Sequence, residues 1–84
     1  MPASKAPATV RVRFKTERAN QIAEERGLQL IRDQAQFFGV TPSSYSRVIN
    51  GVVNPGEDFI ASVLASHPGD ADITWDALFE VVEA

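Results

Sequence analysis

Apolar residues recur every three or four positions in five stretches of the chain, the spacing that places them on one face of an α-helix. The five stretches are residues 16–26, 30–38, 42–50, 55–66 and 75–82. Glycine or proline separates them, and polar caps such as Thr74 begin several of them. The pattern therefore predicts an all-α fold, a compact five-helix bundle with short connections. Its predicted core contains Ile22, Ala35, Phe38, Val40, Val48, Phe59, Ile60, Leu64 and Leu78.

Residues 35–51 place two of these helices on either side of a tight turn. Ala35 is small where two helices must approach closely, and Gly39 tolerates the positive φ that ends the first of them. Thr41 then suits the N-cap of the next helix and Pro42 its first position. This succession is typical of a helix-turn-helix, whose second helix enters the major groove of DNA.

The helix over 42–50 has an inner face of Tyr45, Val48 and Ile49. Its outer face, near the N-terminal end, carries Ser43, Ser44 and Arg47. Hydroxyl groups and a guanidinium are groups that hydrogen-bond to base edges in the major groove. Taken alone, the pattern also fits two helices joined by glycine in a protein that never contacts DNA.

The net charge of −3 opposes nucleic-acid binding until its distribution along the chain is considered. All eight basic residues lie within residues 1–47, which hold four acids and so carry +4. Residues 48–84 hold the other seven acids and carry −7. The split predicts a basic, DNA-facing end and an acidic far end. The alternative is that these charges only solvate the surface.

Residues 10–14 alternate apolar and basic side chains, which predicts an extended strand with Arg11 and Arg13 on one side. Four roles stay open for this strand: pairing with its copy in a second subunit, lying over the core, reaching along DNA as an arm, or a lead-in held by Phe14. The predicted division is a flexible tail over 1–13, with the strand or arm at 10–14, followed by a helix-turn-helix domain over 14–84.

Three segments add specificity to the turn: residues 46–51 (SRVING), 59–65 (FIASVLA) and 75–82 (WDALFEVV). With the NPG of residues 54–56, they resemble the Cro-repressor-like, xenobiotic-response-element-type helix-turn-helix family, in particular small regulators of phages, plasmids and high-GC bacteria. The resemblance covers residues 14–82. It implies a lambda-repressor-like domain that binds double-stranded DNA as a homodimer, with one half-site per subunit.

The resemblance also implies which residues contact DNA. The predicted contacts on or next to the reading helix are Thr41, Pro42, Ser43, Ser44, Ser46, Arg47, Asn50 and Asn54. Three positions depart from the family: Gln34 replaces a buried leucine, Ile31 replaces a phosphate-binding polar residue, and residues 52–53 lack the usual Lys or Arg. The lost phosphate contacts put more weight on the basic residues Arg11, Arg13 and Lys15.

Other chemistry is disfavoured. One histidine and no cysteine exclude a Cys/His nucleophile pair and a His/Cys zinc cluster. The acids Asp70, Asp72 and Asp76 lack the glycine and closing glutamate of an EF-hand, and no glycine-rich phosphate loop is present. We therefore expect no enzyme, metal or cofactor. Because no apolar run has membrane-spanning length and residues 1–9 lack a signal-peptide core, we expect a cytoplasmic protein with no membrane partner.

The sequence thus predicts a sequence-specific regulator of transcription, a repressor, that reads the major groove with the helix over 42–50. We expect a dimer, at least on DNA. Its two subunits contact each other through the apolar face of the last helix or through the strand over 10–14. A rival prediction is a protein-interaction module in which the same fold binds another regulator or a polymerase subunit. In that case the acidic C-terminal part binds the partner or holds a dimer.

Overall fold

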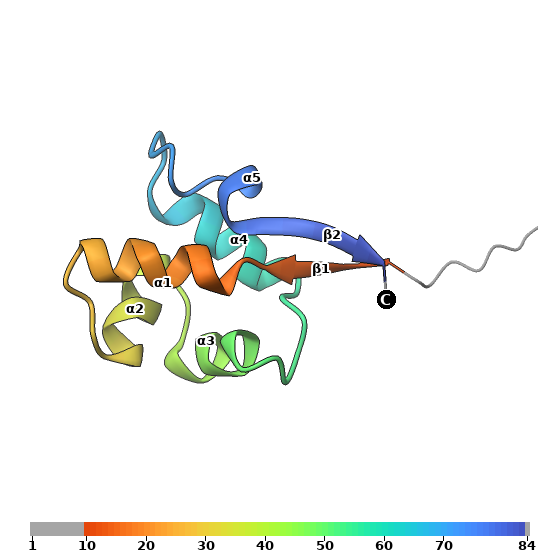
Figure 1. Ribbon diagram of the computed structural model, residues 1–84, viewed down its shortest axis with the longest axis horizontal. Coiled ribbons are helices and arrows are strands. Elements are labelled where there is room, and N and C mark those ends of the chain that lie inside the picture. Colours follow the sequence, from red (N-terminus) through yellow and green to blue (C-terminus); the bar gives the residue numbers. More distant parts are fainter. Residues whose placement is uncertain (1–9, 84) are drawn as a thin grey trace, which may run out of the picture.

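The computed structural model describes residues 10–83, which form helices and a small two-stranded sheet (Figure 1). In chain order the elements are β1 (Val10–Phe14), α1 (Thr16–Glu25), α2 (Ile31–Phe38), α3 (Pro42–Ile49), α4 (Glu57–Ser66), α5 (Trp75–Leu78) and β2 (Phe79–Glu83). Residues 1–9 of the tail predicted over 1–13 lie outside the described residues, and residues 10–13 belong to β1. The helix predicted from Pro55 begins two residues later, with Gly56 as its N-cap.

The prediction of an all-α fold is wrong, because β1 and β2 pair as an antiparallel ribbon and make the fold mixed. The last predicted helix lasts only from Trp75 to Leu78, and the chain then becomes extended. Phe79 pairs with Phe14 and Val81 with Val12, so both strands place apolar residues on the same face of the ribbon. Strand 10–14 therefore pairs within its own chain, a role that was not among the four predicted for it.

The core lies where the base of the ribbon meets the helices. Phe14 is its centre, with ring centroids 5.3 Å from Phe59, 5.4 Å from Phe79, 6.1 Å from Phe38 and 6.3 Å from Tyr45. Six predicted core residues are buried, namely Ile22, Ala35, Phe38, Val48, Phe59 and Leu78. Val40, Ile60 and Leu64 are only partly buried and pack around them. The two strand phenylalanines were not predicted as core because their burial depends on strand pairing.

Candidate nucleic-acid interface

The turn between α2 and α3 has the geometry that the sequence predicts. Gly39 ends α2 with φ of +78°, and the Val40 N–H donates to the Ala35 carbonyl at 3.0 Å. Ala35 is fully buried beneath the turn. Thr41 caps α3, since its Oγ1 accepts from the Ser44 N–H at 3.2 Å. These local bonds fix the direction in which α3 leaves the turn, and α3 lies along the lower side of the molecule in Figure 1.

The outer face of α3 is solvent-exposed at Pro42, Ser43, Ser44 and Arg47. Within residues 10–83, the Arg47 guanidinium has no hydrogen bond or ion pair, so its donors are available to a ligand. A planar guanidinium with unused donors is the group that binds guanine or phosphate with two hydrogen bonds. The structure therefore places the predicted base-reading residues together on one open helix face.

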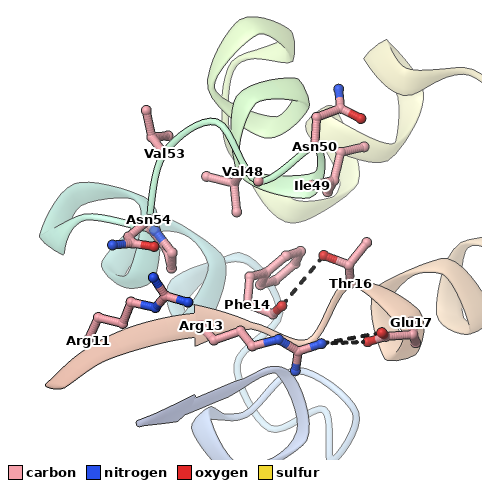
Figure 2. A pocket seen from close by; sticks show the side chains of 12 residues that line it. Arg11, Arg13, Phe14, Thr16, Glu17, Val48, Ile49, Asn50, Val53 and Asn54 are labelled. Carbon is pink, nitrogen blue, oxygen red and sulfur yellow. Dashed lines mark hydrogen bonds and ion pairs between the residues drawn. The ribbon is translucent and has the colours of Figure 1, made fainter. Parts of the chain in front are cut away.

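Ser46 and Asn50 are less available than the sequence prediction assumed. Ser46 is half-buried, and its Oγ accepts from the Asn50 Nδ2 at 3.2 Å. The Asn50 amide points away from the ribbon in Figure 2. These two side chains are hydrogen-bonded to each other, which stabilises the last turn of α3.

A glycine closes the C-terminal end of α3 in a Schellman motif. The Gly51 N–H donates to the Val48 carbonyl at 3.1 Å, and the Val52 N–H donates to the Arg47 carbonyl at 2.9 Å. Gly51 supplies the positive φ of +75° that this motif requires. The loop after α3 is therefore held firmly against the helix that carries Arg47.

A cleft of about 440 Å³ lies between the ribbon, the start of α1 and the loop after α3 (Figure 2). We call it the ribbon cleft. Arg11 rises into it from β1 on the side of Asn54, and Thr16 lines it from α1. Arg11 is exposed and has no hydrogen bond or ion pair among the described residues. Arg13 and Glu17 also line the cleft but are paired with each other, so Arg11 is the cation there that is left to bind a phosphate group.

Two of the three predicted basic phosphate contacts are already occupied. The Arg13 guanidinium donates to the Glu80 carboxylate and lies 3.2 Å from the Glu17 carboxylate. The hydrogen bond from Glu80, and then the charge of Glu17, raise the pKa of Arg13. Lys15 Nζ donates to the Asp76 carbonyl at 2.9 Å. Of the three, only Arg11 is left to contact a ligand.

The pKa of Glu17 is lowered, first by the hydrogen bond from its own backbone N–H and then by the charge of Arg13. Glu17 lies in the first turn of α1, where a carboxylate is also favoured by the helix dipole. The ion pair between Arg13 and Glu17 thus joins β1 to the first turn of α1, which is a structural role.

The sequence predicts a basic end and an acidic end, but the fold brings basic and acidic residues of the two halves together. Arg18 pairs with Asp72 at 2.8 Å and Arg26 pairs with Asp70 at 3.3 Å. With the pair between Arg13 and Glu80, these contacts join the basic half of the sequence to its acidic half. The fold therefore neutralises charges that are far apart in the sequence, which the sequence pattern alone does not reveal.

A second cleft, of about 300 Å³, lies between α3 and the start of α4, and we call it the helix cleft. Ser44 and Arg47 line one side of it, and Glu57 and Asp58 line the other. Sequence reasoning missed the two acids as part of the site, because their position depends on the path of the loop over 51–56. Carboxylates next to a reading helix repel phosphate and accept hydrogen bonds from donors such as the amino group of cytosine.

The departure at Gln34 has a structural explanation. Its Oε1 accepts from the hydroxyl of the fully buried Tyr45 at 3.1 Å, and its Nε2 donates to the Leu28 carbonyl at 3.0 Å. Gln34 therefore satisfies a buried phenol and a loop carbonyl that a leucine would leave without partners. The other departures, at Ile31 and at residues 52–53, leave apolar side chains exposed.

Within residues 10–83, no group of three or more His, Cys, Asp or Glu residues is arranged to hold a metal ion. None of the described helices has the length and apolar character needed to cross a membrane. Comparisons with protein-family models, with curated proteins and with solved structures find no match to this chain. The function is therefore inferred from the geometry of α3 and the clefts beside it.

Proposed function

We propose that this protein is a sequence-specific, double-stranded-DNA-binding regulator of transcription, a repressor, that reads the major groove with α3. The observation that carries the proposal is the exposed face of α3, where Ser43, Ser44 and Arg47, which is unpaired within residues 10–83, lie after a tight turn. We also propose that the chain is a divergent member of the Cro-like family that it resembles. On DNA it acts as a homodimer with one α3 in each half-site.

Recognition divides between the bases and the backbone. Arg47 donates to O6 and N7 of a guanine, and the two serine hydroxyls bind neighbouring base edges. Thr41 caps α3, and the exposed Asn54 lies at the mouth of both clefts, near the path of the DNA backbone. Arg11 contacts a phosphate from the ribbon cleft. In this mechanism the backbone positions α3 and the base edges supply specificity.

The salt dependence of binding follows from the few cations that remain available. Within residues 10–83, Arg13, Arg18 and Arg26 are paired with acids, so this part of each subunit brings little positive charge to DNA. Because each phosphate contact contributes about −0.9 to the slope of log K against log salt concentration, we expect a slope of only about −2 to −4 for a dimer. Affinity then depends strongly on base contacts and on dimerisation.

A selection from random oligonucleotides, followed by titrations of the selected duplex at two salt concentrations, tests this proposal. The expected result is enrichment of one sequence with two related half-sites and a shallow salt slope. A scrambled duplex of the same composition is the control. Failure to bind any duplex at low salt would exclude DNA reading.

The rival function, a protein-interaction module, is favoured by one observation. Large apolar side chains are exposed at the start of α2, at Leu30 and Ile31, and in the loop after α3, at Val52 and Val53. Val53 lines the helix cleft together with Glu57 and Asp58, and an exposed apolar group beside two acids fits a basic, apolar peptide segment. The acidic C-terminal part, by contrast, is partly neutralised by ion pairs. Absence of DNA binding at low salt would favour this rival.

A further inference from the structure

The helix cleft holds charges of both signs that are not paired with each other. Arg47 lines it from α3, and Glu57 and Asp58 line it from the first turn of α4. All three residues are exposed, and within residues 10–83 no ion pair joins them. One cation and two anions give the lining of the cleft a net charge of −1. The donors of Arg47 are thus available in surroundings that are negative overall.

Asp58 lies beside the exposed face of α3 at two places. Besides the helix cleft, it lines a smaller hollow of about 210 Å³ together with Thr41 and Ser44. Thr41, Ser44 and Arg47 are three residues apart in succession, so they follow one side of the helix. The two hollows therefore place Asp58 next to that side of α3 from its N-cap to Arg47.

Two kinds of acceptor on DNA fit the donors of Arg47. Phosphate oxygens accept two hydrogen bonds from a guanidinium, and so do O6 and N7 of guanine. The two acceptors differ in charge, because a phosphate is an anion and the edge of a guanine is neutral. Carboxylates that line the same cleft repel the phosphate and leave the guanine unaffected.

We propose that Glu57 and Asp58 make Arg47 selective for a base edge over a phosphate. This inference rests on the proposed DNA-reading function and names two specificity-determining residues for it. Nonspecific binding to DNA is supplied by phosphate contacts, and the two acids keep Arg47 from contributing to it. They thereby raise the ratio of specific to nonspecific affinity without contacting a base.

The two acids also have a structural effect, because the dipole of α4 favours negative charge in its first turn. The N-cap residue of this helix, Gly56, supplies no side-chain hydrogen bond, which leaves the dipole more dependent on the acids. This structural effect does not depend on Arg47, whereas the proposed effect does. Substituting the acids and Arg47 together therefore separates the two.

The test is a double-mutant cycle on a scrambled duplex without the selected site. Dissociation constants at two salt concentrations are measured for the wild type, Arg47→Ala, Glu57→Gln/Asp58→Asn and the triple variant. The matched control is Glu24→Gln/Glu25→Gln, which removes the same charge from exposed positions on α1 that line neither cleft beside α3. Circular dichroism and thermal unfolding establish that each variant is folded at the temperature of the titrations.

In the wild-type background, Arg47→Ala should leave the affinity for the scrambled duplex unchanged. In the background of Glu57→Gln/Asp58→Asn, it should lower that affinity by about fivefold at low salt, the ratio for one close charge pair in water. The salt slope should become shallower by about 1 per subunit in the same comparison. Glu57→Gln/Asp58→Asn should also lower the ratio of specific to nonspecific affinity, and the control should preserve it.

The inference is overturned if Arg47→Ala changes nonspecific affinity by the same factor with and without the acids, or if the control lowers the specificity ratio equally. It is also overturned if Glu57→Gln/Asp58→Asn loses affinity for the selected duplex alone, which would mean that the acids contact a base. Specific binding by the wild type with any of these results leaves the proposed function intact. Absence of specific binding by the wild type rejects both.

Discussion

At the scale of single residues, substitutions of Arg47 distinguish a side chain that reads a base from one that is only solvated at the surface. Replacing Arg47 by Ala removes two hydrogen bonds to guanine, so we expect a loss of about 1–3 kcal/mol on the preferred site and a relaxed base choice at one position per half-site. Arg47→Lys should recover only part of the affinity, because an ammonium lacks the planar fork. Selections from random oligonucleotides with both variants measure this. Equal affinity and an unchanged selected sequence would assign Arg47 to the solvated surface.

Arg11 and Arg13 lie on the same face of β1, but within residues 10–83 Arg13 is paired with carboxylates and Arg11 is not. Arg11→Ala should weaken binding to all sequences alike and lower the salt slope by about 1 per subunit, because it removes one phosphate contact. Arg13→Ala should leave the salt slope unchanged, since its guanidinium is engaged by Glu17 and Glu80. Salt titrations of both variants provide the comparison. Equal effects would mean that DNA displaces the carboxylates from Arg13.

Tyr45 gives the protein a defined response to alkaline pH. Burial raises the pKa of Tyr45 to about 12, which means that the fold favours the neutral phenol. The associated stability is complete below the unfolded pKa of about 10 and is lost as the pH rises through about 12, by about 2–3 kcal/mol. Denaturant titrations of the wild type should show this loss, and Tyr45→Phe should not.

Tyr45 is the only tyrosine of the chain, so phenolate absorbance reports its ionisation directly. Ionisation of the folded protein near the ordinary pKa of a phenol would contradict the burial seen here. The partner of the phenol, Gln34, was noted from the sequence only as a departure from a family pattern. Its hydrogen bond to Tyr45 depends on how α2 packs on α3, which no local pattern encodes.

At the scale of elements, the turn between α2 and α3 is restricted at Gly39. Gly39 has φ of +78°, and a Cβ there would lie 3.2 Å from the Ser62 carbonyl oxygen of α4. Gly39→Ala combines backbone strain with this close contact, so we expect a loss of about 1–3 kcal/mol in unfolding free energy. Gly27→Ala is the matched control, because Gly27 has φ of +71° with nothing within 4 Å of the added carbon.

Thermal unfolding of the two glycine variants separates the effects. Gly27→Ala reports strain alone, and any excess for Gly39→Ala reports the contact between the turn and α4. An equal loss in both variants would mean that α4 moves aside without cost. A larger loss of stability in Gly39→Ala than in Gly27→Ala would identify the contact with α4 as part of what orients α3.

The elements that the sequence predicts correctly have local signals. Gly39, Thr41 and Pro42 define the turn within four residues, and the exposed face of α3 follows from its period. The last element was mispredicted because Trp75, Leu78, Phe79 and Val82 fit a helical period equally well. What makes residues 79–83 a strand is β1, which is distant in sequence. The pairing of Arg13 with Glu80 was missed for the same reason, and the acids of the helix cleft were missed because their position depends on the path of the loop over 51–56.

At the scale of the whole molecule, the ribbon replaces the last helix as the expected dimer contact. Val10 and Val81 are 60% and 61% exposed on its apolar face, and a two-stranded ribbon has unpaired edges. We expect a homodimer through the ribbon, at least on DNA. Val81→Glu should leave each subunit folded and lower the mass of the complex with DNA in sedimentation.

The matched control for assembly is Ala61→Glu, an exposed position on α4 remote from the ribbon in sequence. It should leave the sedimentation of the complex unchanged. A one-to-one complex of the wild-type protein on every preferred site would contradict a dimer, whichever surface it used.

The pairing of β1 with β2 also decides how the domain responds to mechanical force. Val10 is opposite Glu83, so the described chain enters and leaves at the same tip of the ribbon. The hydrogen bonds of an antiparallel pair run across the strands, so a pull that separates these two ends loads them one at a time. The ribbon should unzip from its tip at low force, and Phe14 and Phe79 at its base would be the last pair to separate before the helices are reached.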